Sequence, residues 1–135
     1  MASFPTDREQ GSAIASFVMI SALLLAVVFA LLQLALVLHV RAIGIDAAGE
    51  GARRAALYGA SSAEGEMRVR QMLQMGAPGV RVSKVSFSKQ AAPVAGRRMI
   101  VAKVRVALPL IGPWGPSAGM TLTGRSLVEE PVHVF

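Results

Sequence analysis

The 135-residue chain contains no cysteine. It therefore has no disulfide, no thiol nucleophile and no thiolate metal site, and its folded part must be held together by packing. Histidine is nearly absent as well: His39 lies near the end of an apolar run, and His133 is third from the C-terminus. Aromatic residues are too few to form a stacking array for single-stranded nucleic acid. The sequence thus gives no support for an enzyme, and we expect neither a cofactor nor a metal.

Charged residues are missing from a long stretch, Gln10 to Val40. A helix needs ~20 apolar residues to cross a bilayer. The apolar core of a secretory signal peptide is shorter, ~7–15 residues. The stretch therefore predicts a retained transmembrane helix, and since no later segment qualifies, a single crossing.

The remaining charge is unevenly distributed. Beyond Val40 there are 13 basic and 6 acidic residues, whereas the leader before the apolar run carries a net charge of −1. Counting Lys and Arg at the two helix ends would place the C-terminal side in the cytoplasm, but long domains translocate largely regardless of charge. A basic exported domain could meet anionic lipid, wall polymer or DNA. Because the basic residues alternate along the strands, we expect them to be dispersed charges that keep the domain soluble. The sequence does not favour nucleic acid as a partner, but it does not exclude it.

The helical pattern continues through residues 41–60 without a proline, which predicts a helix extension; a break near Gly44 is the alternative. The order of Glu50 and Arg54 favours an i,i+4 ion pair. Small residues recur every fourth position and would let another element approach closely: Gly44, Ala48, Ala52, Ala56 and Ala60.

A second, shorter helix is predicted to follow. Ser61 and Glu64 fit a capping box, and the sequence from Gly76 to Pro78 ends the helix. The segment also offers two more i,i+4 ion pairs and three methionines expected to fill the core: Glu64–Arg68, Glu66–Arg70, Met67, Met72 and Met75.

Residues 80–88, 99–108 and 120–128 alternate with a period of two and predict three strands. A slip between Val82 and Val85 predicts a bulge. Trp114 lies in a Pro/Gly-rich loop and either caps the core of the sheet or presents an apolar contact to a neighbour or a membrane surface. A sheet with one apolar face needs a cover, and the helix extension is the expected one. The predicted fold class is α+β: a long N-terminal helix, a short helix and a small antiparallel sheet packed on the long helix.

Four segments resemble the TadE family, minor pilins of the tight-adherence type IV pilus. They are the leader "REQGSA", the helix "LQLALVLHVRAIGIDAAGEGARRAAL", the strand and loop "VRVALPLIGPWGP", and the closing "MTLTGRSLVEEP". Their order and spacing carry the resemblance, which spans essentially the whole chain.

The resemblance implies a pilin-like organisation. Residues 1–11 would be a leader that a prepilin peptidase removes after Gly11, making Ser12 the N-terminus. Residues 12–40 would be the membrane and filament-core helix, 41–60 its exported extension, and 61–135 the head domain. It implies an inner-membrane protein with its N-terminus inside, which other pilin subunits take up into an extracellular pilus through the apolar helix. Its role would be in pilus initiation or assembly for adhesion.

Ser16 departs from the pilin pattern, in which this position often carries a glutamate that pairs with the free amine of an adjacent subunit. A buried charge needs such a partner, and serine brings no charge. Either the subunit occupies a tip or initiating position, or it is incorporated by packing alone. Gln33 could add an interhelical hydrogen bond or bond only locally. The competing interpretation of the whole chain is an uncleaved, single-pass accessory or binding protein of another envelope complex.

Overall fold

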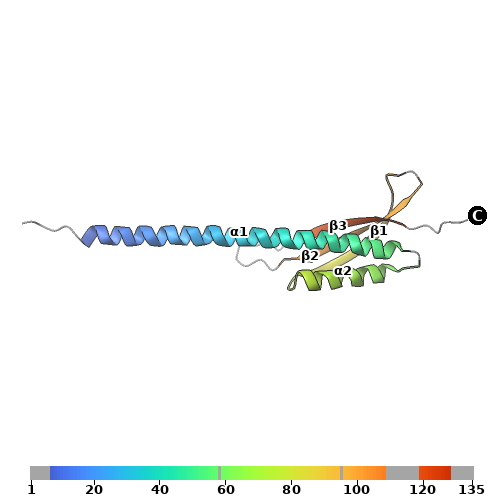
Figure 1. Cartoon of the computed structure of the whole chain (residues 1–135), viewed down its shortest axis with the longest axis horizontal. Coiled ribbons are helices and arrows are strands. Elements are labelled where there is room, and N and C mark those ends of the chain that lie inside the picture. Colours follow the sequence, from blue (N-terminus) through green and yellow to red (C-terminus); the bar gives the residue numbers. More distant parts are fainter. Residues whose placement is uncertain (1–6, 58, 95, 109–118, 129–135) are drawn as a thin grey trace, which may run out of the picture. The chain divides into compact units, whose positions relative to one another are not determined.

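The computed structural model describes residues 7–57, 59–94, 96–108 and 119–128. Two helices are followed by three strands (Figure 1): α1 (Asp7–Ala56), α2 (Ser62–Gly76), β1 (Arg81–Ala91), β2 (Arg98–Ala107) and β3 (Met120–Leu127). The chain divides into two compact units, Met1–Leu36 and Val37–Phe135, and α1 contributes to both. The predicted α+β class, the long apolar helix and the three-stranded antiparallel sheet are confirmed.

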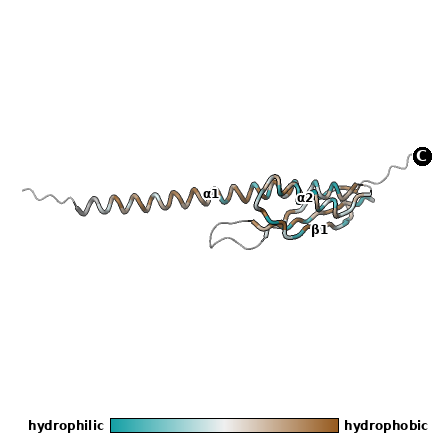
Figure 2. The backbone as a smooth tube through the Cα atoms, turned by 90° about the horizontal axis from the view of Figure 1, so that it is seen from below, coloured by the Kyte–Doolittle hydropathy of each residue, from teal (hydrophilic) through white to brown (hydrophobic). Residues whose placement is uncertain are grey.

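Helix α1 is continuous, so the alternative of a break at Gly44 is wrong. It begins at Asp7, five residues before the predicted start at Ser12: no proline lies between Asp7 and the apolar run, and Gly11 does not interrupt the helix. Gly44 lowers helix propensity by ~1 kcal/mol relative to alanine. Its lack of a side chain makes room for Leu122 of β3, with which a Cβ at this position would collide. Figure 2 shows the change along α1 from a hydrophobic to a mixed sequence.

Helix α2 begins where its sequence predicts, but among the described residues only the Ser61 half of the predicted capping box is formed, because the Glu64 carboxylate contacts Arg54 instead. The Ser61 hydroxyl accepts a hydrogen bond from the Glu64 backbone N–H at 3.3 Å. Its buried residues are spaced four apart: Gly65, Val69 and Leu73. Met67 and Met75 lie on the opposite side and are each 67% exposed, so the prediction that they fill the core is wrong; Met72 packs against the core.

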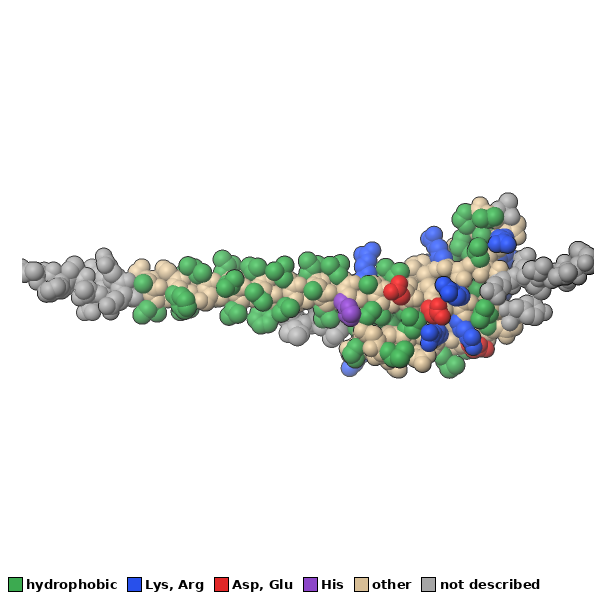
Figure 3. Space-filling view, viewed as in Figure 1, with side chains coloured by type: hydrophobic (Ala, Val, Ile, Leu, Met, Phe, Trp, Pro, Cys, Tyr) green, Lys and Arg blue, Asp and Glu red, His purple; other side chains and the backbone are tan. Residues whose placement is uncertain are grey.

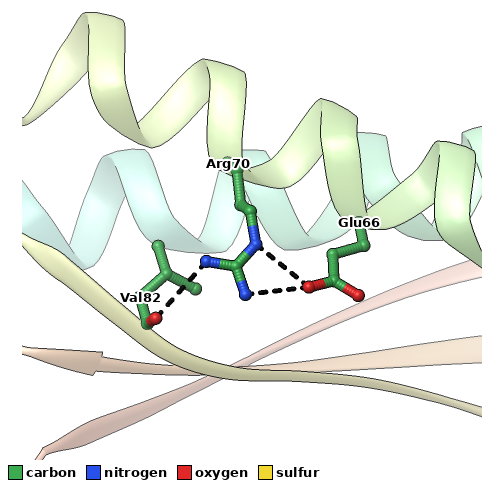
Figure 4. A network of polar contacts seen from close by, with 3 residues as sticks. All are labelled: Glu66, Arg70 and Val82. Carbon is green, nitrogen blue, oxygen red and sulfur yellow. Dashed lines mark hydrogen bonds and ion pairs between the residues drawn. The ribbon is translucent and has the colours of Figure 1, made fainter.

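Salt bridges of α2 only partly follow the predicted pattern. The Glu66–Arg70 pair is confirmed at 2.8 Å, and the Arg70 guanidinium also donates to the carbonyl of Val82 at 3.4 Å, which joins α2 to β1 (Figure 4). The Glu50–Arg54 and Glu64–Arg68 predictions are wrong. Partners come largely from the facing helix instead: Arg54–Glu64 at 3.5 Å and Arg68–Glu50 at 3.9 Å, with Arg53 also 3.9 Å from Glu50.

These exchanged pairs follow from the close packing of the two helices. A Cβ on Gly65 would lie 2.7 Å from the carbonyl oxygen of Gly51, and a Cβ on Gly51 would collide with Val69. At such short separation, arginine side chains on one helix reach carboxylates on the other. The i,i+4 spacing rule considers one helix alone and therefore cannot predict ion pairs between two helices.

The sheet has the order β1-β2-β3 and is antiparallel throughout. The predicted bulge is present, because the β1–β2 register shifts between Val82 and Lys84. The predicted inward face of β2 is buried or half-buried, with Val104 and Val106 fully buried, whereas Lys103 and Arg105 on the other face are exposed.

The helix extension is the second layer of the core. Ala48 and Ala52 are fully buried and Ala56 is 3% exposed. The sheet reaches the helix backbone at Gly124 of β3, where a Cβ would lie 2.5 Å from the carbonyl oxygen of Ala48. The expectation that small residues admit the sheet closely is confirmed.

Ala52→Leu is expected to lower the free energy of unfolding by ~1–3 kcal/mol, because the added bulk overpacks a filled interface. Ala42→Leu, at an exposed position of the same helix, should leave it within about 0.5 kcal/mol of the parent value. Pulse proteolysis of the full chain in detergent micelles measures both. Equal stability of the two variants would contradict the packing described here.

Candidate functional site: the apolar helix

The first part of α1 carries apolar side chains on which no other described element packs. Every residue from Gly11 to Leu36 is exposed except the half-buried Ser21. Figure 3 shows hydrophobic side chains along this part of the helix, whereas the Lys, Arg, Asp and Glu side chains that the figure colours gather over the part of the chain that follows it. An 18-residue window of α1 has a mean hydropathy of 2.8, and α1 is the one described helix long and apolar enough to cross a membrane.

Water is a poor solvent for this surface. Burial of apolar area is worth about 25 cal/mol per Å², and large side chains such as Phe17 and Met19 are more than 70% exposed. Within α1 the backbone hydrogen bonds are satisfied internally, which is the requirement for a segment placed in hydrocarbon. The segment therefore suits either lipid or a bundle of other apolar helices.

The three residues predicted at the N-terminal end of the segment all lie on α1. Gly11, Ser12 and Ser16 are exposed, and a Cβ added to Gly11 would meet nothing within 4 Å. The peptide bond after Gly11 thus lies within a helix, with free space around it.

Gln33 lies on the same helix, away from Ser16. At about 100° per residue, the two side chains point about 100° apart, so they would meet different neighbours. Ala22, Ala26 and Ala30 recur at intervals of four and lie on the same stripe of the helix as Gln33. Small residues together with one amide are typical of helix–helix contacts in apolar surroundings.

Of Trp114 and the two histidines, the structure describes only His39. Trp114 and His133 lie outside the described residues. His39 belongs to the second of the two compact units, Val37–Phe135, which we call the folded unit. Its Nε2 lies 3.3 Å from the carbonyl oxygen of Gly76 at the end of α2. Sequence reasoning missed this contact, which depends on where the second helix ends in space.

Among the described residues of the folded unit, no Ser or Thr hydroxyl is hydrogen-bonded to an Asp, Glu or His side chain. One surface hollow of this unit, about 620 Å³, is shallow and has Asp46, Glu50 and Arg125 among its lining residues. Thr123 also lines it, but no hydrogen bond joins its hydroxyl to either carboxylate. Within the described ranges, no three His, Asp or Glu residues are grouped closely enough to hold a metal ion.

Comparison with known proteins adds no identity: no family model, curated protein or solved structure matches this chain.

Proposed function

We propose that the protein is a minor pilin-like subunit of a tight-adherence type IV pilus. In this proposal it is anchored in the inner membrane by α1 with its N-terminus inside, cleaved after Gly11, and then takes part in pilus initiation or assembly for adhesion. The observation that carries the proposal is the apolar, solvent-exposed segment of α1, which continues without a break into the part of the helix that forms one layer of an α+β core.

The energetics of assembly fit this arrangement. Moving the segment from lipid into a bundle of similar helices exchanges one apolar environment for another, so the transfer has little hydrophobic cost. The stripe of Ala22, Ala26 and Ala30 with Gln33 supplies close contacts and one polar bond in such a bundle. Lipid alone would not require small residues at this spacing.

The folded unit fits the role of a head domain. Ala47, Ala48 and Ala52 of α1 are completely buried in its core, so the head cannot separate from the helix without unfolding. A subunit built in this way carries its head wherever its helix is inserted.

The absence of a carboxylate at residue 16 favours an initiating or tip position. An isolated buried charge costs several kcal/mol, so Ser16→Glu should reduce filament number at least twofold if no amine lies opposite. Ser16→Ala, which adds no charge, should assemble like the parent. Filament counts by negative-stain microscopy and immunoblots of sheared pili measure the two effects. An increase in the amount of Ser16→Glu protein along longer filaments would show that an amine is available and would refute the tip position.

Deletion of the protein tests the function itself. We expect few filaments of near-normal length, restored by the parent chain, and the protein at a few copies per filament in the sheared fraction. An unchanged number of filaments, with the protein confined to the membrane fraction, would instead support an uncleaved accessory protein of another complex.

A further inference from the structure

The charges of the folded unit are sorted between its two layers. Eight of the thirteen basic residues beyond Val40 lie on the strands or the β1–β2 turn, and the strands contain no Asp or Glu. The described carboxylates of this unit are on the helices, where Glu50, Glu64 and Glu66 already contact arginines of α1 and α2. The helix layer is therefore nearly neutral and the sheet is strongly basic.

The alternation of basic residues along the strands predicted dispersed charge, but in the sheet it places several of these residues side by side on one face. Lys84 is paired in register with Arg105, and Lys103 is two residues from Arg105 on β2, about 7 Å along the strand. We define the basic face as the solvent side of the sheet formed by Lys84, Ser86, Lys103, Arg105 and Thr121. All but Thr121 lie on the first two strands, and the five line one shallow hollow of about 210 Å³.

Side chains of the basic face are available to a partner. Lys84, Lys103 and Arg105 are exposed, and none forms an ion pair or hydrogen bond with another described side chain. Lysine, arginine and hydroxyl side chains are the groups that bind phosphate oxygens of nucleic acids. Duplex DNA presents one negative charge per about 1.7 Å, so the charge complementarity is strong.

We propose that the basic face binds the phosphate backbone of duplex DNA without reading its sequence. No aromatic side chain lies on the described part of this face, so the stacking that holds single strands is missing. Membrane-surface binding also uses inserted apolar side chains, and the centre of the face offers none. This proposal goes beyond pilus assembly and does not depend on cleavage after Gly11.

A charge-matched pair of variants tests the proposal on the full chain in phosphatidylcholine nanodiscs. The face variant is Lys84→Gln, Lys103→Gln and Arg105→Gln. The control variant, Lys89→Gln, Arg97→Gln and Arg98→Gln, removes the same charge from exposed residues of the same sheet and turn that lie off the basic face. Fluorescence anisotropy with a labelled 30-base-pair duplex gives Kd as a function of salt.

We expect the face variant to bind at least about tenfold more weakly than the parent, with a log–log salt slope shallower by about 2 to 3, because each lost phosphate contact removes roughly 0.9. The control variant should stay within about threefold. Equal weakening in both variants, or tighter binding of a single strand than of the duplex, would overturn the proposal.

The parent chain provides an independent test, because its three lysines divide between the two sides of the sheet. Duplex DNA should protect Lys84 and Lys103 from acetylation and leave Lys89 reactive. Equal protection by polyglutamate at the same charge concentration would reassign the face to any acidic polymer. Protection by phosphatidylglycerol in the disc, without DNA, would reassign it to lipid headgroups; either result refutes duplex DNA as the partner.

Discussion

Gly124→Ala is expected to destabilise the folded unit by about 3 kcal/mol, the upper end of the usual cost of overpacking. The added Cβ would collide with the backbone at Ala48 and Gly49 of α1. Backbone atoms of a helix cannot move aside as a flexible side chain can, so α1 and β3 must separate. Pulse proteolysis of the full chain in detergent micelles measures the free energy of unfolding.

Gly49→Ala is the matched control, because Gly49 lies directly opposite Gly124 on α1. A Cβ on Gly49 would meet nothing within 4 Å, and alanine is favoured over glycine in a helix by ~1 kcal/mol. This variant should be as stable as the parent or more stable. If Gly124→Ala were equally well tolerated, the close approach of sheet and helix would be wrong.

Gly11→Leu is expected to abolish processing, because it places a bulky side chain at the proposed scissile bond. The protein should accumulate as a precursor eleven residues longer than the mature chain and be absent from sheared pili. The head should fold normally, since Gly11 contacts nothing that a side chain would disturb. Mass spectrometry of the membrane fraction and proteolytic resistance of the head measure the two effects.

Ala15→Leu controls for added bulk near the end of the helix. It introduces the same side chain four residues beyond Gly11, at another exposed position of α1, and should be processed normally. A mature mass for Gly11→Leu would contradict cleavage at this bond. Loss of processing in both variants would point to a general effect on membrane insertion.

Much of the fold could be predicted because local patterns and global packing agree. The alternation in β2 correctly identified the inward side of Val104 and Val106, and the slip after Val82 correctly marked the bulge. The Ser61 cap fixed the start of α2 to within one residue. Small residues at intervals of four identified the side of α1 that lies under the sheet.

What could not be predicted depends on distances between elements. Arg54 and Arg68 find carboxylates on the facing helix because Gly51 and Gly65 bring the two helices together. Met67 and Met75 resemble core residues in sequence, yet the buried line of α2 runs through Val69 and Leu73, on the other side. Likewise, alternation places Lys103 on one side of its strand. It does not show which basic residues of the neighbouring strand lie beside Lys103, because that depends on the register of the sheet.

The candidate site was likewise predictable only in part from the sequence. The apolar segment was readable from composition, and its exposure in the structure agrees with a membrane or bundle environment. The roles of Gly11, Ser12, Ser16 and Gln33 rest on resemblance to pilins and stay predictions, because cleavage and subunit contacts involve partners outside the chain.

The intact mass of the protein extracted from membranes, together with its N-terminal sequence, tests the central claim most directly. One spectrum reports whether residues 1–11 are present, and peptidase cleavage on the inner side of the membrane would also fix the orientation of α1. The pilin proposal predicts a chain that begins at Ser12. A chain that begins at Met1 or Ala2 would contradict it and leave a single-pass accessory protein in its place.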